Sequence, residues 1–285
     1  MPVYPVGTMH IDFTKMHGLG NDFIVVESAE LAAQLTPQHW QRLADRHRGI
    51  GFDQALIIEP PRRTDTEAFY RIFNADGHEV EQCGNGARCI AELLRLHGRS
   101  HDGQVRMDCP GGLVEAHVPG GGVVAVNMGV PDFTPAASHF DAQGQPGPGY
   151  DIEADGLSAH CGVVSMGNPH AVLRVDDVAA APVAQLGALL ERHPRFAQRV
   201  NVGFMQVLSP AHIRLRVFER GVGETQACGT GACAAVAVGR RDALLADQVR
   251  VSLPGGDLVI RWAGPGQPLW MEGPAEVSFR GSIEL

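Results

Sequence analysis

Lysine is almost absent from this sequence of 285 residues: Lys15 is the one lysine among 23 basic residues, which face 32 acidic ones. Nucleic-acid-binding proteins neutralise phosphates with clustered basic side chains, whereas this chain has no basic run and a net charge of −9. No apolar run approaches the roughly 18 residues that a membrane-spanning helix needs. The N-terminus also lacks a basic segment followed by a long apolar one, as a secretory signal has. We therefore expect a cytoplasmic protein that binds neither nucleic acid nor a membrane.

Cysteine is sparse, with six residues in the whole chain. This number is too low for a disulfide-stapled secreted domain, so we expect thiols in a reducing compartment. Structural zinc sites use paired Cys-x-x-Cys ligands, and no such pair occurs, so the sequence predicts no metal site. The cysteines are Cys83, Cys89, Cys109, Cys161, Cys228 and Cys233.

The chain repeats itself at half its length. Segment 71–87 aligns without a gap on 216–232 at an offset of 145 positions, with Arg, Phe, Glu, Cys, two Gly and Ala in common. Segment 104–112 shares six of nine residues with 248–256 at an offset of 144. Ordered matches at a nearly constant offset indicate two homologous halves, with the functional site expected where they face each other. The repeats run roughly from 11 to 131 and from 158 to 274.

The length of the chain also favours two domains. We predict a first domain over 1–130 and a second over 131–274, with a C-terminal strand at 275–285 that packs back onto the first. The stretch 132–156 is the richest in proline and glycine. Such a composition does not suit a helix or a central strand, so we expect it to join the halves.

Short β-branched and aromatic runs bounded by turn residues predict strands in both halves. Helices are predicted at 37–46, where Thr36 can cap the first turn, at 86–97, and at 231–245. The last of these is apolar on every side and should be buried. The expected fold is therefore α+β, with two pseudo-symmetric domains, each a curved, mostly antiparallel sheet wrapped around a central helix. The predicted strands are 23–27, 54–58, 70–73, 123–126, 163–165, 171–175, 203–208 and 213–218.

Cys83 and Cys228 occupy matching positions of the repeat, each followed by Gly-x-Gly at the start of a predicted central helix. Unpaired backbone N–H groups and the helix dipole at such a position bind carboxylates. They also lower the pKa of a cysteine into a range of roughly 3.5 to 7.5. A lone cysteine is often only a small buried apolar residue, but the duplication favours two reactive thiols. The other four cysteines lack this motif and are predicted to be core residues.

Two thiols from homologous halves suit a reaction on opposite faces of one atom, such as racemisation of an α-amino acid. One thiolate would remove the α-proton, and the opposite thiol would supply a proton to the planar carbanion. The helix N-termini would stabilise the charge that develops on the carboxylate. Racemases that use pyridoxal phosphate need a Schiff-base lysine, and Lys15 lies in no phosphate-binding context. We therefore expect a reaction without a cofactor.

Several motifs closely resemble the diaminopimelate epimerase family over nearly the whole chain from Met9. The resemblance implies interconversion of LL- and meso-diaminopimelate without a cofactor, two pseudo-symmetric α+β domains, and a homodimer. The motifs are KMHGLGNDF (15–23), FNADG (73–77), QCGNGAR (82–88), GNPH (167–170), NVG (201–203), ERGVGE (219–224) and ACGTG (227–231).

The same resemblance implies roles for single residues. Cys83 and Cys228 would be the acid/base thiols, and His170 and Glu219 would tune them or hold the reacting amine. Arg220 would bind the distal carboxylate and Glu219 an ammonium group, which suits a substrate that is an amino acid at both ends. The substrate-binding residues would be Asn21, Gln54, Asn74, Gly84, Asn85, Asn168, Asn201, Glu219, Arg220, Gly229 and Thr230.

Three alternatives stay open on the sequence. A proline-racemase-like enzyme shares the two-thiol logic but has no need of the Glu219–Arg220 pair, and phenazine-pathway isomerases lack the thiol pair. A thiol-based metal-binding or redox module is disfavoured by the cysteine spacing. Two features depart from the family: residues 1–8 precede its usual start, and Phe279 stands where a tyrosine usually makes a dimer contact.

Overall fold

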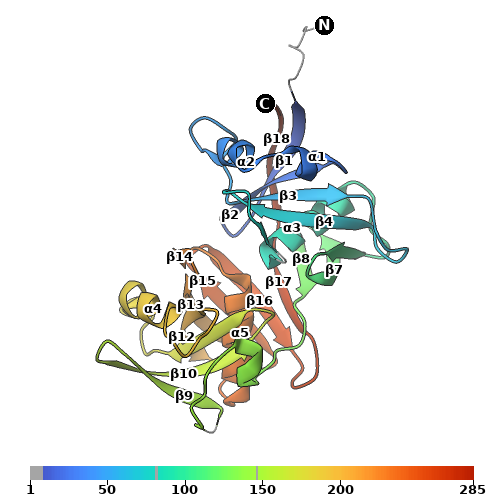
Figure 1. Ribbon diagram of the computed structural model, residues 1–285. Helices are drawn as coiled ribbons and strands as arrows, with labels where there is room; N and C mark the ends of the chain where they lie inside the picture. The colour runs from blue at the N-terminus through green and yellow to red at the C-terminus, as the bar shows by residue number, and fades with distance from the viewer. Residues whose placement is uncertain (1–8, 81–82, 146) are drawn as a thin grey trace, which may run out of the picture. The chain divides into compact units, whose positions relative to one another are not determined.

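The computed structural model describes residues 9–80, 83–145 and 147–285, so the N-terminal extension 1–8 and Gln82 lie outside the described part of the chain. The chain divides into two compact units (Figure 1). Unit 1 contains the chain up to Val126 together with Pro274–Leu285, and unit 2 contains Asn127–Gly273. In the part of the chain that is described, no helix is long and apolar enough to cross a membrane.

Unit 1 is built from a mostly antiparallel sheet and the long helix α3. Its elements are β1 (His10–Gly18), β2 (Asn21–Glu27), α1 (Leu31–Gln34), α2 (Pro37–Ala44), β3 (Gln54–Glu59), β4 (Ala68–Asn74), β5 (Glu79–Val80), α3 (Gly84–Leu96), β6 (Gln104–Cys109), β7 (Gly112–Gly120), β8 (Val123–Asn127, whose last residue is assigned to unit 2) and β18 (Glu276–Glu284).

Unit 2 has the same plan around helix α5. Its elements are the 3-10 turn η1 (Pro135–Ser138), β9 (Gly149–Ala154), β10 (Leu157–Ser165), β11 (Pro169–Arg174), α4 (Val183–Glu191), β12 (Asn201–Ser209), β13 (His212–Glu219), β14 (Gly223–Thr225), α5 (Gly229–Arg241), β15 (Gln248–Leu253), β16 (Gly256–Trp262) and β17 (Leu269–Pro274, whose last residue is assigned to unit 1).

Strand pairing confirms the repeat found in the sequence. In unit 1, β1–β2 and β3–β4–β5 pair antiparallel, whereas β2–β3 and β4–β6 pair parallel. In unit 2, β10–β11 and β12–β13–β14 pair antiparallel, whereas β11–β12 and β13–β15 pair parallel. An additional antiparallel strand flanks each set, β18 beside β1 and β9 beside β10. The two halves therefore fold into the same pattern, strand for strand.

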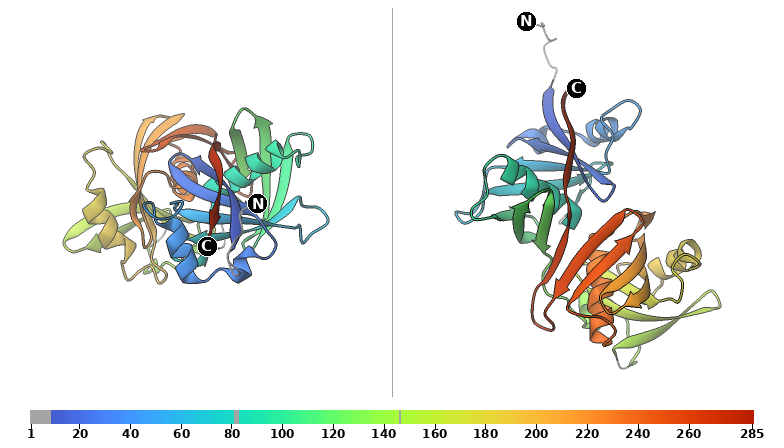
Figure 2. Two further views of the ribbon diagram at one scale, coloured as in Figure 1. Left: turned by 90° about the horizontal axis from the view of Figure 1, so that it is seen from above. Right: turned by 180° about the vertical axis from the view of Figure 1, so that it is seen from behind.

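Helices α3 and α5 lie among the strands of their own units, as the views in Figure 2 show. Residues Gly84–Leu94 of α3 and nearly all of Gly229–Gly239 of α5 are buried. The apolar, small-residue sequence of α5 explains this burial, because such a helix has no polar face to present to water. The predicted fold class, two pseudo-symmetric α+β halves around central helices, is confirmed.

The predicted elements differ from the structure mainly at their ends. Helix α5 stops at Arg241, four residues before the predicted end. There Ala243 takes a left-handed conformation, and the N–H groups of Ala243 and Leu244 bond back to the carbonyls of Arg240 and Gly239. This pattern of bonds closes a helix and directs the chain away from it.

The expectation that 132–156 merely joins the halves is wrong. The segment contains η1 and β9, and it lies within unit 2. Phe140 and Tyr150 pack edge to face with ring centroids 4.8 Å apart, and both belong to the core of that unit. Among the described residues β9 pairs with β10 on one side, which makes it an edge strand, and edge strands tolerate neighbouring proline and glycine.

Candidate active site

Cys83 and Cys228 are the N-cap residues of α3 and α5. Both have extended backbones, with φ/ψ of −144°/114° and −108°/107°, and Gly84 and Gly229 begin the helices. This confirms the prediction that each thiol stands where a loop enters a central helix. The first backbone N–H groups of both helices are therefore directed toward the thiol end, as an anion-binding position requires.

The Cys228 thiol lies among polar groups of unit 2. The thiol is buried, with 5% of the residue exposed, and the Gly231 N–H donates to Sγ at 3.4 Å. The hydroxyl oxygen of Thr230 lies 3.6 Å from Sγ. Burial and the neighbouring carboxylate of Glu219 raise the pKa of Cys228 well above its ordinary value, although the contacts with Thr230 and Gly231 act in the opposite direction. The lowered pKa predicted from the helix N-terminus is therefore wrong for Cys228, because burial and Glu219 act more strongly in the opposite direction.

Glu219 is the last residue of β13 and interacts with the Cys228 thiol. The Thr225 hydroxyl donates a hydrogen bond to its carboxylate. Burial raises the pKa of Glu219, so this carboxyl group accepts a proton more readily than an exposed glutamate does. The Glu219 carboxylate and the Cys228 thiol therefore interact within unit 2.

His170, on β11, is almost wholly buried. Burial and the charge of Arg220 lower the pKa of His170 to about 3, so the imidazole is neutral near pH 7. Its Nε2 lies 2.9 Å from Oδ1 of Asn168, and the Asn168 amide donates to the Thr230 hydroxyl at 3.4 Å. These contacts form a chain from His170 to the hydroxyl beside Cys228.

Arg220 is exposed, but its backbone is held from two sides. The Arg220 N–H donates to Oδ1 of Asn201 at 2.9 Å, and the Asn201 amide in turn donates to the Pro169 carbonyl. The next N–H, that of Gly221, donates to the buried carboxylate of Glu191 at 3.0 Å. The backbone of this turn is therefore fixed, whereas the exposed side chain donates from Nη1 to the Gln198 carbonyl.

In unit 1, Asn21 and Asn85 come together. Asn21 follows a tight turn whose residues Leu19 and Gly20 both have positive φ, as a two-residue hairpin loop requires. The Asn85 side-chain amide donates to Oδ1 of Asn21 at 3.1 Å, and the Asn21 side-chain amide donates to Oδ2 of Asp53 at 2.9 Å. The residue after Gly84 is thus connected to the β1–β2 turn.

Gln54 and Asn74 face each other across β3 and β4, and the Gln54 amide donates to Oδ1 of Asn74 at 2.9 Å. The Oε1 atom of Gln54 is buried and has no hydrogen-bond partner among the residues that the structure describes. Such an atom is costly unless a ligand or water supplies a donor. Gln54 therefore offers an acceptor for an N–H or O–H group.

Three residues that hold these groups in place were not predicted from the sequence. Asp53 orients Asn21, buried Arg88 donates to Oδ1 of Asn85 at 2.9 Å, and Glu191 holds the turn after Arg220. Arg88 could have been found, because it follows Asn85 by three residues on one face of a helix. Glu191 gave no signal, because its helix α4 was not predicted.

The remaining cysteines are buried, as predicted. Burial raises the pKa of Cys89 and Cys161 to about 12, which makes these thiols inert near neutral pH. Among residues 9–80, 83–145 and 147–285, no group of three histidine, cysteine or acidic side chains could hold a metal ion.

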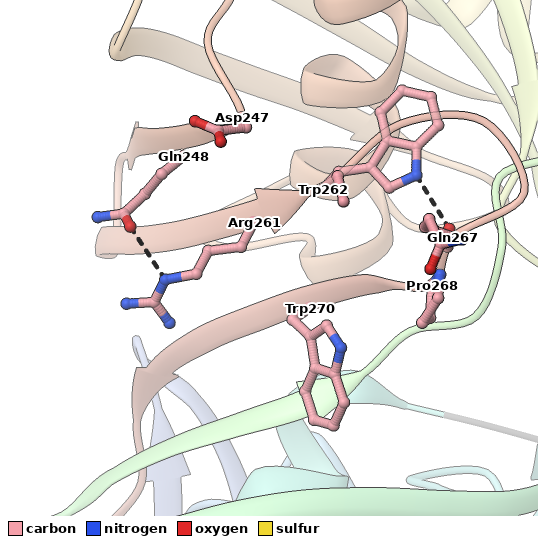
Figure 3. A pocket seen from close by; sticks show the side chains of 8 residues that line it. Asp247, Gln248, Arg261, Trp262, Gln267, Pro268 and Trp270 are labelled. Carbon is pink, nitrogen blue, oxygen red and sulfur yellow. Dashed lines mark hydrogen bonds between the residues drawn. The ribbon is translucent and has the colours of Figure 1, made fainter.

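A shallow pocket of about 320 Å³ lies elsewhere on unit 2, between the edges of β15, β16 and β17 (Figure 3). Its lining includes Trp262 and Trp270, and none of the predicted site residues. The Trp262 indole donates to the Gln267 carbonyl and Arg261 donates to Gln248, so these polar groups are already bonded within the protein.

Comparison with known proteins agrees with this arrangement. The sequence model of the family described as diaminopimelate epimerase matches residues 13–134 and 162–278, one stretch in each half. The chain belongs to the diaminopimelate epimerase family. Through its family, it is placed among epimerases and isomerases.

Solved structures with this fold are distant in sequence. A hydroxyproline epimerase from Agrobacterium vitis with bound trans-4-hydroxy-L-proline is 16% identical, with a TM-score of 0.68 over 97% of this chain and 93% of that one. A probable proline racemase from Agrobacterium radiobacter is 19% identical, with a TM-score of 0.66 over 96% and 92%. A phenazine biosynthesis protein of the PhzF family from Bacillus anthracis is 14% identical, with a TM-score of 0.66 over 96% and 99%. These likenesses support the fold.

Proposed function

We propose that this member of the diaminopimelate epimerase family interconverts LL- and meso-diaminopimelate by a two-base reaction of Cys83 and Cys228 that needs no cofactor. The observation that carries the proposal is the duplication of a cysteine N-cap, followed by Gly-x-Gly, at the two central helices. Family membership makes this substrate the first to test.

The proposed reaction moves one proton at each face of the α-carbon. The α C–H bond breaks as its proton passes to one thiolate, and the electron pair spreads onto the substrate carboxylate, where helix N–H groups stabilise it. The S–H bond of the other cysteine then breaks as its proton passes to the opposite face. The raised pKa of Cys228 favours the thiol form that donates in this direction. In the reverse direction Cys228 must first become a thiolate: its S–H proton passes to the Glu219 carboxylate, and the thiolate then removes the α-proton.

Differences between the halves support binding of a substrate that is an amino acid at both ends. Asn74 and Glu219 occupy matching positions of the repeat, at the ends of β4 and β13, but only the second is charged. Arg220 follows Glu219, so unit 2 presents a carboxylate and a guanidinium side by side. In the proposal Arg220 binds the distal carboxylate and Glu219 an ammonium group.

Most of the other proposed contacts are uncharged. Gly84, Asn85, Gly229 and Thr230 would hold the reacting carboxylate, and His170 would tune the thiols or hold the reacting amine. The remaining substrate contacts would be the amides of Asn21, Gln54, Asn74, Asn168 and Asn201. The unpartnered Oε1 of Gln54 supplies an acceptor for a substrate N–H. Uncharged donors and acceptors orient a zwitterion without neutralising the carboxylate that the helix N-termini bind.

Racemisation of proline or hydroxyproline is the second candidate, favoured by the fold shared with the hydroxyproline epimerase. The two functions separate in one assay. The protein is incubated under reductant with LL-diaminopimelate, with L-proline and with trans-4-hydroxy-L-proline, and the stereoisomers are separated by chiral chromatography. We expect meso-diaminopimelate and no change in the proline substrates. Inversion of a proline substrate alone would overturn the assignment.

Single cysteine variants complete this test. Cys83→Ala and Cys228→Ala should each abolish conversion, whereas the matched control Cys161→Ala, which removes a buried and inert thiol, should remain active. Conversion by Cys83→Ala or Cys228→Ala at the wild-type rate would contradict the two-base proposal.

We also propose that the protein is a homodimer, as the family resemblance implies. Phe279 on β18 is half exposed and contacts only Phe13 among the aromatic rings of the described residues. Sedimentation equilibrium should give twice the mass of the chain, and a monomer at micromolar concentration would contradict the proposal.

A further inference from the structure

The same ion pair occurs at matching places in the two units. In unit 1, Nε and Nη2 of Arg71 donate to the two carboxylate oxygens of Glu79, both at 2.7 Å. In unit 2, Nε and Nη2 of Arg216 donate to the two oxygens of Glu224 at 2.6 and 2.8 Å. Arg71 and Arg216 are 145 positions apart, and so are Glu79 and Glu224. The same offset relates Cys83 to Cys228.

Each pair spans a short hairpin, beside the few backbone bonds between its strands. Arg71 lies on β4 and Glu79 on β5, a strand of two residues, while Arg216 lies on β13 and Glu224 on β14, a strand of three. So short a second strand provides few backbone hydrogen bonds. In both hairpins the glutamate is followed four residues later by the cysteine that caps the central helix.

The hairpin of unit 2 also brings Glu219 to Cys228. Glu219 ends β13 opposite Gly223, and the Thr225 hydroxyl bonds its carboxylate across the two strands. The carboxylate in turn interacts with the Cys228 thiol. If β14 separated from β13, the thiol would lose this neighbour.

The energy of the pairs argues for a local role. The Arg71 and Arg216 side chains are both 26% exposed, and Glu79 and Glu224 are 34% and 31% exposed. Ion pairs at such positions contribute little to global stability, but a bidentate contact fixes geometry well. Global stability alone therefore gives little reason for two identical pairs, each four residues before a helix-capping cysteine.

We propose that Arg71–Glu79 and Arg216–Glu224 are equivalent positioning pairs, each holding closed the hairpin that leads to its own thiol. The proposal rests on the proposed roles of Cys83 and Cys228. It does not depend on the substrate, because it concerns the accessibility of each thiol in the free protein.

Alkylation measures this accessibility directly. The native protein is treated with iodoacetamide, and the rate at each cysteine is read from its peptide by mass spectrometry. Arg216→Gln should raise the rate at Cys228 about threefold, the size expected for local opening after loss of one partly exposed ion pair, and leave Cys83 unchanged. Arg71→Gln should do the reverse.

Two controls separate a local effect from a global one. Arg250→Gln removes the contact of Arg250 with Asp257 on the surface of unit 2, where the nitrogen and oxygen are 4.0 Å apart. It should change the alkylation rate of neither Cys83 nor Cys228. Cys161, buried in the core of unit 2, should remain unmodified in every variant. Modification of Cys161 in Arg216→Gln would show global opening and overturn the proposal.

Charge reversal tests whether the pair itself acts. Arg216→Glu combined with Glu224→Arg should return the Cys228 rate to within about twofold of wild type. In Arg216→Gln, the pH of half-maximal alkylation at Cys228 should also fall, because Glu219 no longer lies against the thiol. Equal changes at both thiols, no change at either, or no rescue by charge reversal would each overturn the proposal. Because the alkylation assay contains no substrate, its result can be interpreted even if the protein does not epimerise diaminopimelate.

Discussion

Removal of the Glu191 carboxylate should weaken both the folding of unit 2 and the hold on Arg220. The carboxylate is 2% exposed and accepts from the Gly221 N–H at 3.0 Å. A hydrogen bond to a charged acceptor contributes about 1.5–3 kcal/mol, and the exposed position of Gly221 puts this bond at the lower end. The two buried methylene groups contribute about 0.8 kcal/mol each. The contacts with Arg192 and Arg199 add little, since both guanidinium groups are more than half exposed.

We therefore expect Glu191→Ala to lower the free energy of unfolding by about 3 kcal/mol, and Glu191→Gln, which keeps the methylene groups and one oxygen, by about 1 kcal/mol. Urea unfolding followed by fluorescence measures both. In steady-state kinetics with diaminopimelate, Glu191→Gln should raise KM and leave kcat nearly unchanged. The reason is that a contact with the distal carboxylate is equally strong in the ground and transition states.

The matched control is Glu153→Gln, which changes an exposed acidic residue on β9 of the same unit. It should leave both the unfolding midpoint and KM at their wild-type values. If Glu191→Ala unfolded at the same urea concentration as this control, the reasoning about the turn after Arg220 would be refuted.

Three further predictions concern pH and packing. Burial opposes ionisation of Asp22, but hydrogen bonds, first that from Arg46, hold its pKa well below the usual value. The ionised carboxylate therefore adds to the free energy of unfolding above about pH 4, and this contribution is lost as the pH falls further. Urea unfolding of Asp22→Asn should accordingly depend less on pH between about pH 4 and 2 than that of wild type. A methyl group on Gly187 would lie 2.7 Å from Cβ of Phe218, so Gly187→Ala should cost about 1–2 kcal/mol of stability in the same assay, where an unchanged midpoint would contradict the geometry. The imidazole of His170, with its pKa lowered to about 3, should show no titration by NMR between about pH 5 and 8, and a midpoint near 6.5 would contradict its burial.

The sequence predicted the features that depend on short-range pattern. The internal repeat located both helix-capping cysteines, and the apolar run of α5 predicted a buried helix. Thr36 caps α2 as expected, accepting from the His39 N–H. Each of these features depends on a few neighbouring residues and their spacing. A single sequence was therefore enough to predict it.

Features that depend on contacts between distant segments were missed. The high pKa of Cys228 follows from burial and from Glu219, which the fold brings to the helix end against the effect of the backbone N–H groups. The segment containing Phe140 and Tyr150 has a flexible composition, yet its aromatic rings complete a core formed by later strands. Helix α4 has a glycine in its centre and no capping side chain at its start, so local signals for it were weak.

Solvent deuterium tests the central claim, that two different thiols act on the two faces of one α-carbon. LL-diaminopimelate is incubated with the reduced protein in D2O, and both stereoisomers are analysed by mass spectrometry early in the reaction. The two-base account predicts one α-deuterium in each meso product molecule and none in the remaining LL substrate. Meso product that keeps its original α-proton, or LL substrate that exchanges before any product forms, would contradict it.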